Sequence, residues 1–335
     1  MKAVVLHERG RLAVEDWPRP SAGDGELLLR LRGCGLCGSD IAKIGGAVAT
    51  PLVLGHELVG DVVAAGAGVA GFDTGDRVVA AHHVPCGTCH YCRRGSASMC
   101  RAFKTSHLDP GGFAEYVRVP EANVRHASFR IPAHVSDEAA SFVEPLACCL
   151  RAVRRARVER GDTAAVVGLG SIGCLFVQLF RRAGATVIGV DPLADRGALA
   201  KRLGAEAAGS ADLARAAVMD ASDARGADHV LISGGGADVL AWAADTVRDG
   251  GTIHYFAGGG GDALPISLAT VYHRELTITT TYSSSPADLA EAFALVTSGE
   301  VVVEPLITHR LPLEALAEGV DLMRRRAALK VFVTP

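Results

Sequence analysis

Four cysteines stand close together in one short segment, as C-x-x-C-x-x-C followed by a fourth cysteine after seven more residues. Four thiolates so close in sequence are typical of a closed, tetrahedral zinc site. The residues between them are polar or glycine and offer little apolar core, so a bound metal would stabilise the segment directly. An iron–sulfur cluster is the alternative that this spacing leaves open. The predicted ligands of this metal are Cys86, Cys89, Cys92 and Cys100.

A glycine-rich turn follows an apolar segment in the second half of the chain. Residues 165–173 read Ala-Val-Val-Gly-Leu-Gly-Ser-Ile-Gly, a Gly-x-Gly-x-x-Gly pattern between a predicted strand and a predicted helix over 174–182. The glycines permit a tight turn, a close approach to a pyrophosphate and close helix packing, and the helix N-terminus attracts phosphate charge. The turn therefore predicts a dinucleotide site that contains Gly168, Gly170, Ser171, Ile172 and Gly173.

The next predicted strand ends in Asp191, 21 positions after Gly170. This is close to the spacing expected of a carboxylate that binds the adenosine ribose, and its charge would repel a 2′-phosphate. NAD is therefore favoured, although Arg196 leaves NADP open. A nicotinamide implies hydride chemistry, which favours zinc over an iron–sulfur cluster at the four cysteines. Two later glycine runs, at 234–236 and 258–261, are assigned no chemistry.

Three further short motifs carry groups that bind metals: Cys37-Gly38-Ser39-Asp40, Gly55-His56-Glu57 and Val143-Glu144-Pro145. Each is a weak signal by itself, because a lone buried cysteine or histidine is more often structural than a ligand. Together they supply one thiolate, one imidazole and two carboxylates. Such a mixed set suits a zinc ion that keeps one coordination position open for a substrate.

With these motifs the chain resembles the zinc-containing medium-chain alcohol dehydrogenases, in particular the polyol branch that includes sorbitol and threonine dehydrogenases. The resemblance runs from Met1 to Val331 and includes the segment Gly112-Phe113-Ala114-Glu115-Tyr116. It implies an α/β protein with a GroES-like β-barrel catalytic domain and a Rossmann domain with a doubly wound parallel sheet. The implied activity is zinc-dependent transfer of hydride from a secondary alcohol to NAD, which yields a ketone.

The resemblance also implies roles for single residues. Cys37 and His56 would bind the catalytic zinc, Glu57 would be a third ligand, and Glu144 would be a direct ligand or hold the metal-bound water. Ser39 would take the proton of the alcohol. Asp40 is expected to support an imidazole ligand. Many relatives have a histidine relay five residues after the cysteine ligand, but this chain has Ala42 there, so proton release is expected to use Lys43 or water.

The loop at 45–50, between the first two motifs, is short and built of small residues. It suggests room for a bulky or polar substrate such as a polyol, a cyclitol or an amino sugar. A threonine-type or aldehyde-type dehydrogenase that uses the same site is an alternative. A third reading, a non-catalytic zinc- and nucleotide-binding protein, is disfavoured by the complete set of catalytic residues.

The elements expected to position these residues fall into three segments. Residues 1–150 contain short β-like runs and predict a barrel-like, zinc-binding domain. Residues 151–285 alternate strands with helices, as in a parallel nucleotide-binding sheet. Residues 286–335 are implied to return to the first domain, beginning with a helix capped by Ser285 with Pro286 in its first position.

Composition limits the partners and the compartment. The 34 basic and 37 acidic residues nearly cancel and form no basic face, so nucleic acid is not an expected partner. The uncharged stretch 163–180 is interrupted by glycines and is not expected to span a membrane. The nine cysteines suit a reducing compartment, and no signal peptide is apparent, so we expect a cytoplasmic protein. The resemblance implies a homodimer or homotetramer formed through the sheet edge of the nucleotide domain.

Overall fold

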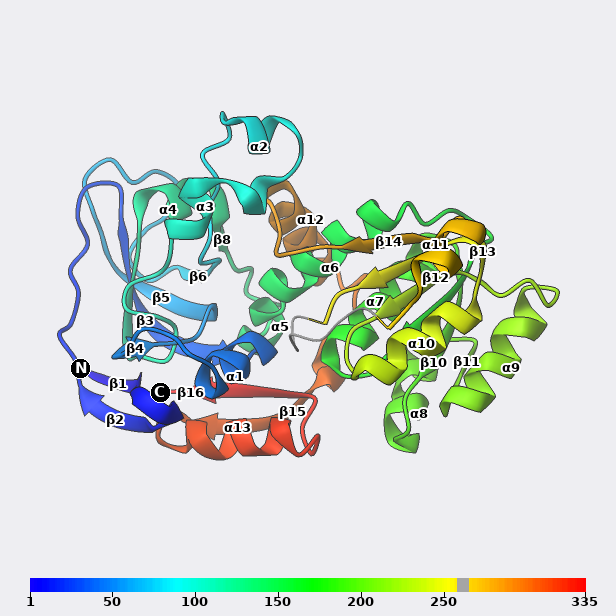
Figure 1. Ribbon diagram of the computed structural model, residues 1–335. Helices are drawn as coiled ribbons and strands as arrows, with labels where there is room; N and C mark the ends of the chain where they lie inside the picture. Colours follow the sequence, from blue (N-terminus) through cyan, green and yellow to red (C-terminus); the bar gives the residue numbers. More distant parts are fainter. Residues whose placement is uncertain (258–264) are drawn as a thin grey trace. The chain divides into compact units, whose positions relative to one another are not determined.

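The computed structural model describes residues 1–257 and 265–335, so the second glycine run, at 258–261, lies outside the described residues. The chain divides into two compact units. The first unit consists of Met1–Ala147 and Ser284–Pro335, and the second consists of Cys148–Ser283. Two separate stretches of sequence therefore build the first unit, and both chain ends belong to it (Figure 1).

The first unit is built on a seven-stranded, mostly antiparallel sheet. Along β3 (Leu27–Gly35), Leu29 and Leu31 are buried while Arg30 and Arg32 are exposed, as expected of a strand with one face on a core. The other strands of this sheet are β5 (Glu57–Ala65), β6 (Arg77–Ala80), β7 (Tyr116–Val119), β8 (Ser128–Arg130), β15 (Ile307–Pro312) and β16 (Lys330–Thr334). A smaller sheet contains β1 (Lys2–Leu6), β2 (Leu12–Asp16) and β4 (Leu52–Val53).

Short helices connect the strands of the first unit. They are α1 (Gly38–Gly45), α2 (His90–Arg93), α3 (Arg101–Thr105), α4 (Glu121–Ala127), α5 (Asp137–Ser141), α12 (Pro286–Thr297) and α13 (Leu316–Arg324). The helix α6 (Val143–Ala156) begins in the first unit and ends in the second. The predicted cap of α12 is confirmed: the Ser285 hydroxyl accepts from the Asp288 amide, and the Asp288 carboxylate accepts from the Ser285 amide.

The second unit has a six-stranded, wholly parallel sheet in the order β11-β10-β9-β12-β13-β14, which is the Rossmann order. All five residues of β9 are buried, because helices cover both faces of such a sheet. Its strands are β9 (Thr163–Val167), β10 (Thr186–Val190), β11 (Ala207–Gly209), β12 (Ala227–Ile232), β13 (Val247–Tyr255) and β14 (Thr277–Thr280). Its helices are α7 (Ser171–Arg182), α8 (Ala194–Arg202), α9 (Ala211–Ala221), α10 (Ala237–Thr246) and α11 (Leu268–His273).

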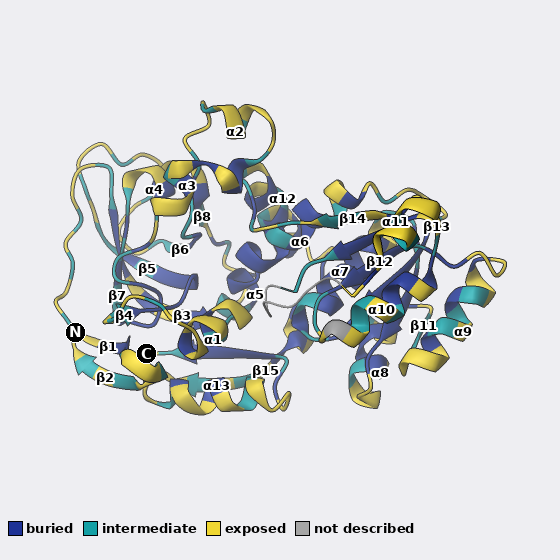
Figure 2. Cartoon of the chain, viewed as in Figure 1, coloured by how far each residue is buried: buried dark blue, intermediate teal, exposed yellow. Residues whose placement is uncertain are grey.

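Burial follows this layered arrangement. In Figure 2 the central strands β9, β10 and β12 of the second unit are largely buried, whereas the outer surfaces of α8 and α9 are exposed. The uncharged stretch 163–180 forms β9 and most of α7, as the glycines within it suggested. Among the described residues, no helix combines the length and the apolar character needed to cross a bilayer.

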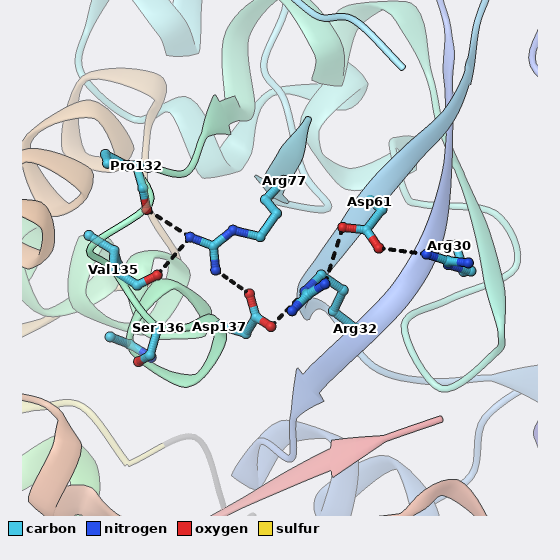
Figure 3. A network of polar contacts seen from close by, with 9 residues as sticks. Arg30, Arg32, Asp61, Arg77, Pro132, Val135, Ser136 and Asp137 are labelled. Carbon is cyan, nitrogen blue, oxygen red and sulfur yellow. Dashed lines mark hydrogen bonds and ion pairs between the residues drawn. The ribbon is translucent and has the colours of Figure 1, made fainter. Parts of the chain in front are cut away.

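Charged side chains tie α5 to the main sheet of the first unit (Figure 3). The Asp137 carboxylate accepts from Arg32 Nε at 2.6 Å and from Arg77 Nη1 at 2.9 Å. Arg32 also reaches Asp61, which pairs with Arg30. Because the Asp137 side chain is only 15% exposed, these charge-assisted bonds are poorly screened by solvent.

Replacing Asp137 with alanine is expected to lower the free energy of unfolding by about 1–3 kcal/mol, because two guanidinium groups lose their shared acceptor. Denaturant titration of the variant measures this loss. Asp73→Ala is the matched control: the Asp73 side chain is 90% exposed and lies 3.6 Å from Arg130, so its removal should have no measurable effect. Equal losses in the two variants would contradict a structural role for the network.

Candidate functional site

The four clustered cysteines converge in the loop that carries α2 and α3. Their sulfur atoms all lie within 4.8 Å of one another, with Cys89 and Cys92 3.5 Å apart and Cys86 and Cys100 3.6 Å apart. Thiolates around one tetrahedral zinc are separated by about 3.8 Å, given Zn–S bonds of about 2.3 Å. All four are free thiols rather than disulfides. The observed separations therefore fit a structural zinc ion.

A second group of potential ligands lies where β3 runs into α1 and where β5 begins. One ligand atom each of Cys37, His56 and Glu57 lies within 4.8 Å of the other two. Cys37 is the N-cap of α1, and Glu57 is the first residue of β5. Glu144, although buried at the start of α6, does not belong to this three-residue group. A thiolate, an imidazole and a carboxylate are a donor set that zinc accepts.

Asp40 orients the imidazole of this group. Its side chain is fully buried, and its Oδ1 lies 3.3 Å from His56 Nδ1, which leaves Nε2 of the ring for an ion. The carboxylate also accepts from the backbone amides of Cys37 and Gly55, at 3.2 and 3.4 Å. Burial alone would raise the pKa of Asp40, but His56, the bond from the Cys37 amide and the charge of Lys43 outweigh it and lower the pKa. Asp40 therefore stays ionised beside the histidine.

Glu57 has a partner that the sequence analysis missed. Lys330 Nζ donates to both carboxylate oxygens of Glu57, at 2.8 and 2.6 Å, and lies 3.4 Å from the carbonyl oxygen of Leu36. The side chains of Lys330 and Glu57 are 3% and 0% exposed. Burial lowers the pKa of Lys330, but the Glu57 carboxylate more than offsets this and raises it. The carboxylate of this metal-binding group is thus neutralised by a buried ammonium.

Ser39 and Lys43 lie on α1 and are exposed. Because they are four positions apart, their side chains lie on the same face of the helix, one turn apart. Ser39 is in the first turn, two residues after Cys37. The helix thus carries a hydroxyl next to the ligand group and an amine one turn further on.

The glycine turn of the second unit lies between β9 and α7. Gly168 has a positive φ of +85°, which favours glycine. A Cβ added at Gly170 would meet no atom within 4 Å, so the backbone there is open to a ligand. A Cβ at Gly173 would collide with the Gly168 carbonyl oxygen. Ser171 and Ile172 form the first turn of α7, where free amides can face a phosphate.

Asp191, at the end of β10, is 6% exposed and is fixed by the backbone around it. Its carboxylate accepts from the amides of Leu169 and Leu193, each at 2.9 Å. The first of these bonds connects the acid directly to the glycine turn. Arg196 Nη1 lies 3.7 Å from Asp191 Oδ2, so the charge of this arginine is partly satisfied by the acid.

Variants of two glycines distinguish an effect on ligand binding from an effect on the stability of the fold. Gly170→Ala should leave the melting temperature unchanged, since the added methyl meets no protein atom, but weaken NAD binding at least tenfold by obstructing the pyrophosphate. Gly173→Ala should lower the free energy of unfolding by about 1–3 kcal/mol through the clash with Gly168. Calorimetric titration with NAD and thermal melting distinguish the two effects. Normal NAD affinity in Gly170→Ala would contradict this placement of the pyrophosphate.

Fold and site together define a metal-dependent dehydrogenase that uses a nicotinamide nucleotide. Two family models match the chain: the alcohol dehydrogenase GroES-like domain over residues 23–129, and the zinc-binding dehydrogenase domain over residues 171–298. Sorbitol dehydrogenase of Halalkalibacterium halodurans is 31% identical, and L-threonine 3-dehydrogenase of Bacillus velezensis is 33% identical. In both comparisons the alignment covers 100% of this chain and 99% of the relative.

Solved structures agree with these matches. The alcohol dehydrogenase TADH from Thermus sp. ATN1 is 31% identical with a TM-score of 0.87. A zinc-binding dehydrogenase from Sinorhizobium meliloti, bound to NADP, is also 31% identical with a TM-score of 0.88. Both comparisons cover 100% of this chain and 99% of the other. The chain therefore belongs to the zinc-dependent medium-chain alcohol dehydrogenase family, which confirms the predicted family and fold class.

Proposed function

We propose that this enzyme oxidises a secondary alcohol of a polyol or a related polyhydroxylated compound to a ketone, with NAD as the hydride acceptor. The single observation that carries the proposal is the convergence of Cys37, His56 and Glu57 in a chain that also holds the dinucleotide turn. Relatives named for sorbitol and D-altritol support the substrate class, the latter 34% identical over 94% of this chain.

In this proposal Cys37, His56 and Glu57 hold the catalytic zinc, and Cys86, Cys89, Cys92 and Cys100 hold the structural one. Bound zinc would act as a Lewis acid toward the alcohol oxygen, and bound NAD would accept the hydride. Lys330 reduces the negative charge that Glu57 brings to the group. Glu144 supplies a second carboxylate to the site. Its negative charge contributes to the raised pKa of Lys330.

The chain's own residues would also remove the alcohol proton. Ser39, exposed in the first turn of α1, is proposed to accept a hydrogen bond from the substrate hydroxyl and to pass its proton outward. We propose that Lys43 then relays the proton along the exposed face of the helix. Asp40 fixes the His56 ring during turnover, because its carboxylate is itself held by two backbone amides.

Asp191 supports NAD as the cofactor. Its buried carboxylate would accept hydrogen bonds from ribose hydroxyls and repel a 2′-phosphate. Arg196, which lies near this carboxylate, is proposed to border the same ribose.

The test is steady-state reduction of NAD and of NADP by zinc-loaded protein, with polyols, cyclitols, amino sugars, threonine, aldehydes and simple alcohols as substrates. We expect turnover with NAD and a polyhydroxylated secondary alcohol, and its loss in Cys37→Ser. Cys148→Ala, which changes a cysteine outside both ligand groups, is the control. Exclusive turnover of threonine or of an aldehyde would replace the substrate class, and absence of all turnover despite tight NAD binding would favour a non-catalytic role.

We further propose a cytoplasmic enzyme that forms a homodimer or a homotetramer through the edge of the second unit's sheet. Among the described residues, β14 pairs with β13 only. Large apolar side chains are exposed on α11 and just after β14, namely Leu268 (84%), Tyr272 (78%) and Tyr282 (61%). Light scattering should show an oligomer for the parent protein and a smaller species for Tyr272→Glu. A monomeric parent protein would contradict the proposed assembly.

A further inference from the structure

A row of four rings connects the catalytic ligand group with the four-cysteine lobe (residues 86–100). The rings belong to His56, His82, His83 and Phe103. Their successive centroids are 4.5, 3.8 and 4.8 Å apart. One end of this ring row is a proposed ligand of the catalytic metal. The other end is Phe103 in α3, the helix whose N-cap is the lobe's last cysteine.

Strand register places the first two rings side by side. His82 follows β6 by two residues, and His56 directly precedes β5. The antiparallel pairing of these strands sets Leu58 against Ala80, so its continuation places positions 56 and 82 opposite each other. The contact between the two imidazoles is therefore built into the sheet of the first unit.

The far end of the ring row is attached to the lobe. The backbone amide of Cys86 donates to the sulfur of Cys100 at 3.4 Å. Ser106, just after α3, accepts from the amide of Val84 at 2.9 Å and donates to the carbonyl oxygen of Phe103 at 3.1 Å. These bonds join the segment that enters the lobe to the helix that leaves it. The position of Phe103, which is 2% exposed, therefore depends on the order of the lobe.

The lobe has little besides a metal to keep it ordered. Helix α2, at its centre, has no buried residue. The four sulfur atoms, within 4.8 Å of one another, form a site whose binding free energy is also folding free energy. The lobe thus has two states, one ordered by an ion and one loose without it. Only the ordered state holds Phe103 firmly against His83.

The near end of the ring row restrains the catalytic imidazole. Asp40 Oδ1 lies 3.3 Å from His56 Nδ1 and fixes one nitrogen of the ring. A ring held at one nitrogen can still tilt about that contact. His82 packs against His56 and limits this tilt, and His83 in turn packs against His82. Groups that orient a metal-binding histidine raise the affinity of the site for its ion.

We propose that His83 and Phe103 are positioning residues that couple the structural metal site to the catalytic one. An ion in the lobe orders the ring row, which orients His56 and tightens metal binding at the catalytic group. Such coupling is reciprocal, so metal at the catalytic group also tightens binding in the lobe. The inference rests on the proposed function, because it assumes that Cys37, His56 and Glu57 hold a metal ion.

The test measures metal affinity rather than turnover. Cobalt(II) is titrated into protein whose lobe already holds zinc, and the absorption band of the single cobalt–thiolate bond at Cys37 is followed. We expect the Kd for cobalt to rise about tenfold in Phe103→Leu and in His83→Leu, and also in Cys100→Ser, whose lobe holds no zinc. His83→Phe keeps a ring in the row and should stay within about threefold of the parent value.

A double variant tests whether the lobe acts through the ring row. Cys100→Ser combined with Phe103→Leu should bind cobalt no more weakly than Cys100→Ser alone, because both changes interrupt the same path. The matched control is Phe129→Leu, which removes a ring from the stacked pair with Phe293 in the same unit and should leave the Kd unchanged.

The outcomes separate this coupling from the proposed function. An unchanged Kd in Phe103→Leu and His83→Leu would overturn the coupling, and so would losses that add in the double variant. Equal losses in His83→Leu and His83→Phe would overturn it as well, because the ring would then be irrelevant. All three results leave the proposed function intact. A parent protein that binds no cobalt at Cys37 would overturn both.

Discussion

Replacement of Lys330 by methionine is expected to lower the free energy of unfolding by about 3–5 kcal/mol. Methionine fills a similar volume but leaves the Glu57 carboxylate, whose side chain is 0% exposed, without its ammonium partner. A buried charge that has lost its counter-ion keeps its desolvation cost and gains nothing in return. Denaturant titration of zinc-free protein measures the loss without contribution from the metal.

The companion variants show where the loss comes from. Lys330→Arg keeps the charge and should cost much less than Lys330→Met, while the double variant Glu57→Gln, Lys330→Met removes both charges and should recover part of the stability. A loss below about 1 kcal/mol in Lys330→Met would mean that water reaches Glu57, contrary to its burial. Zinc content measured on the same proteins tells whether the ammonium also holds Glu57 for metal binding.

Replacement of Cys100 by serine is expected to release the structural zinc and to destabilise the segment around residues 86–100. The four sulfur atoms lie within 4.8 Å of one another, and structural zinc contributes on the order of 10 kcal/mol of binding free energy. Zinc per chain should fall from two equivalents to one, and proteases should cleave the lobe first.

The control for this variant is Cys148→Ala, which leaves both groups of ligands intact. It should retain two equivalents of zinc and resist cleavage as the parent protein does. Full zinc content in Cys100→Ser, or cleavage elsewhere in the chain, would contradict a structural metal in the lobe. Treatment of the parent protein with a chelator should reproduce the cleavage pattern of Cys100→Ser.

Features that depend on neighbouring residues were predictable from the sequence. Examples are the strand, glycine turn and helix of the nucleotide unit and the cap at Ser285. Each is determined by interactions among a few neighbouring residues. The family and the fold class followed from the resemblance that these motifs carry, and the comparisons confirm both. The metal-binding roles of the clustered residues stay predictions that the variants above will test.

Features that depend on distant residues were not predictable in this way. Glu57 and Lys330 are 273 positions apart, and neither residue type signals a buried pair by itself. The proximity of His82 to His56 likewise follows from strand register, which places the two residues opposite each other. No periodicity or spacing encodes such contacts, because tertiary pairing decides them. The bond that the Asp191 carboxylate accepts from the Leu169 amide, 22 positions away, belongs to the same class.

The return of the chain to its first unit sets an order of events during synthesis. Strand β16, which pairs with β3 and carries Lys330, leaves the ribosome only after the whole second unit has been made. Until then the sheet of the first unit lacks β15 and β16, and Glu57 lacks its ammonium. The second unit is contiguous and can fold as a nascent domain. Each newly made chain should therefore become able to bind nucleotide before it becomes able to catalyse the reaction.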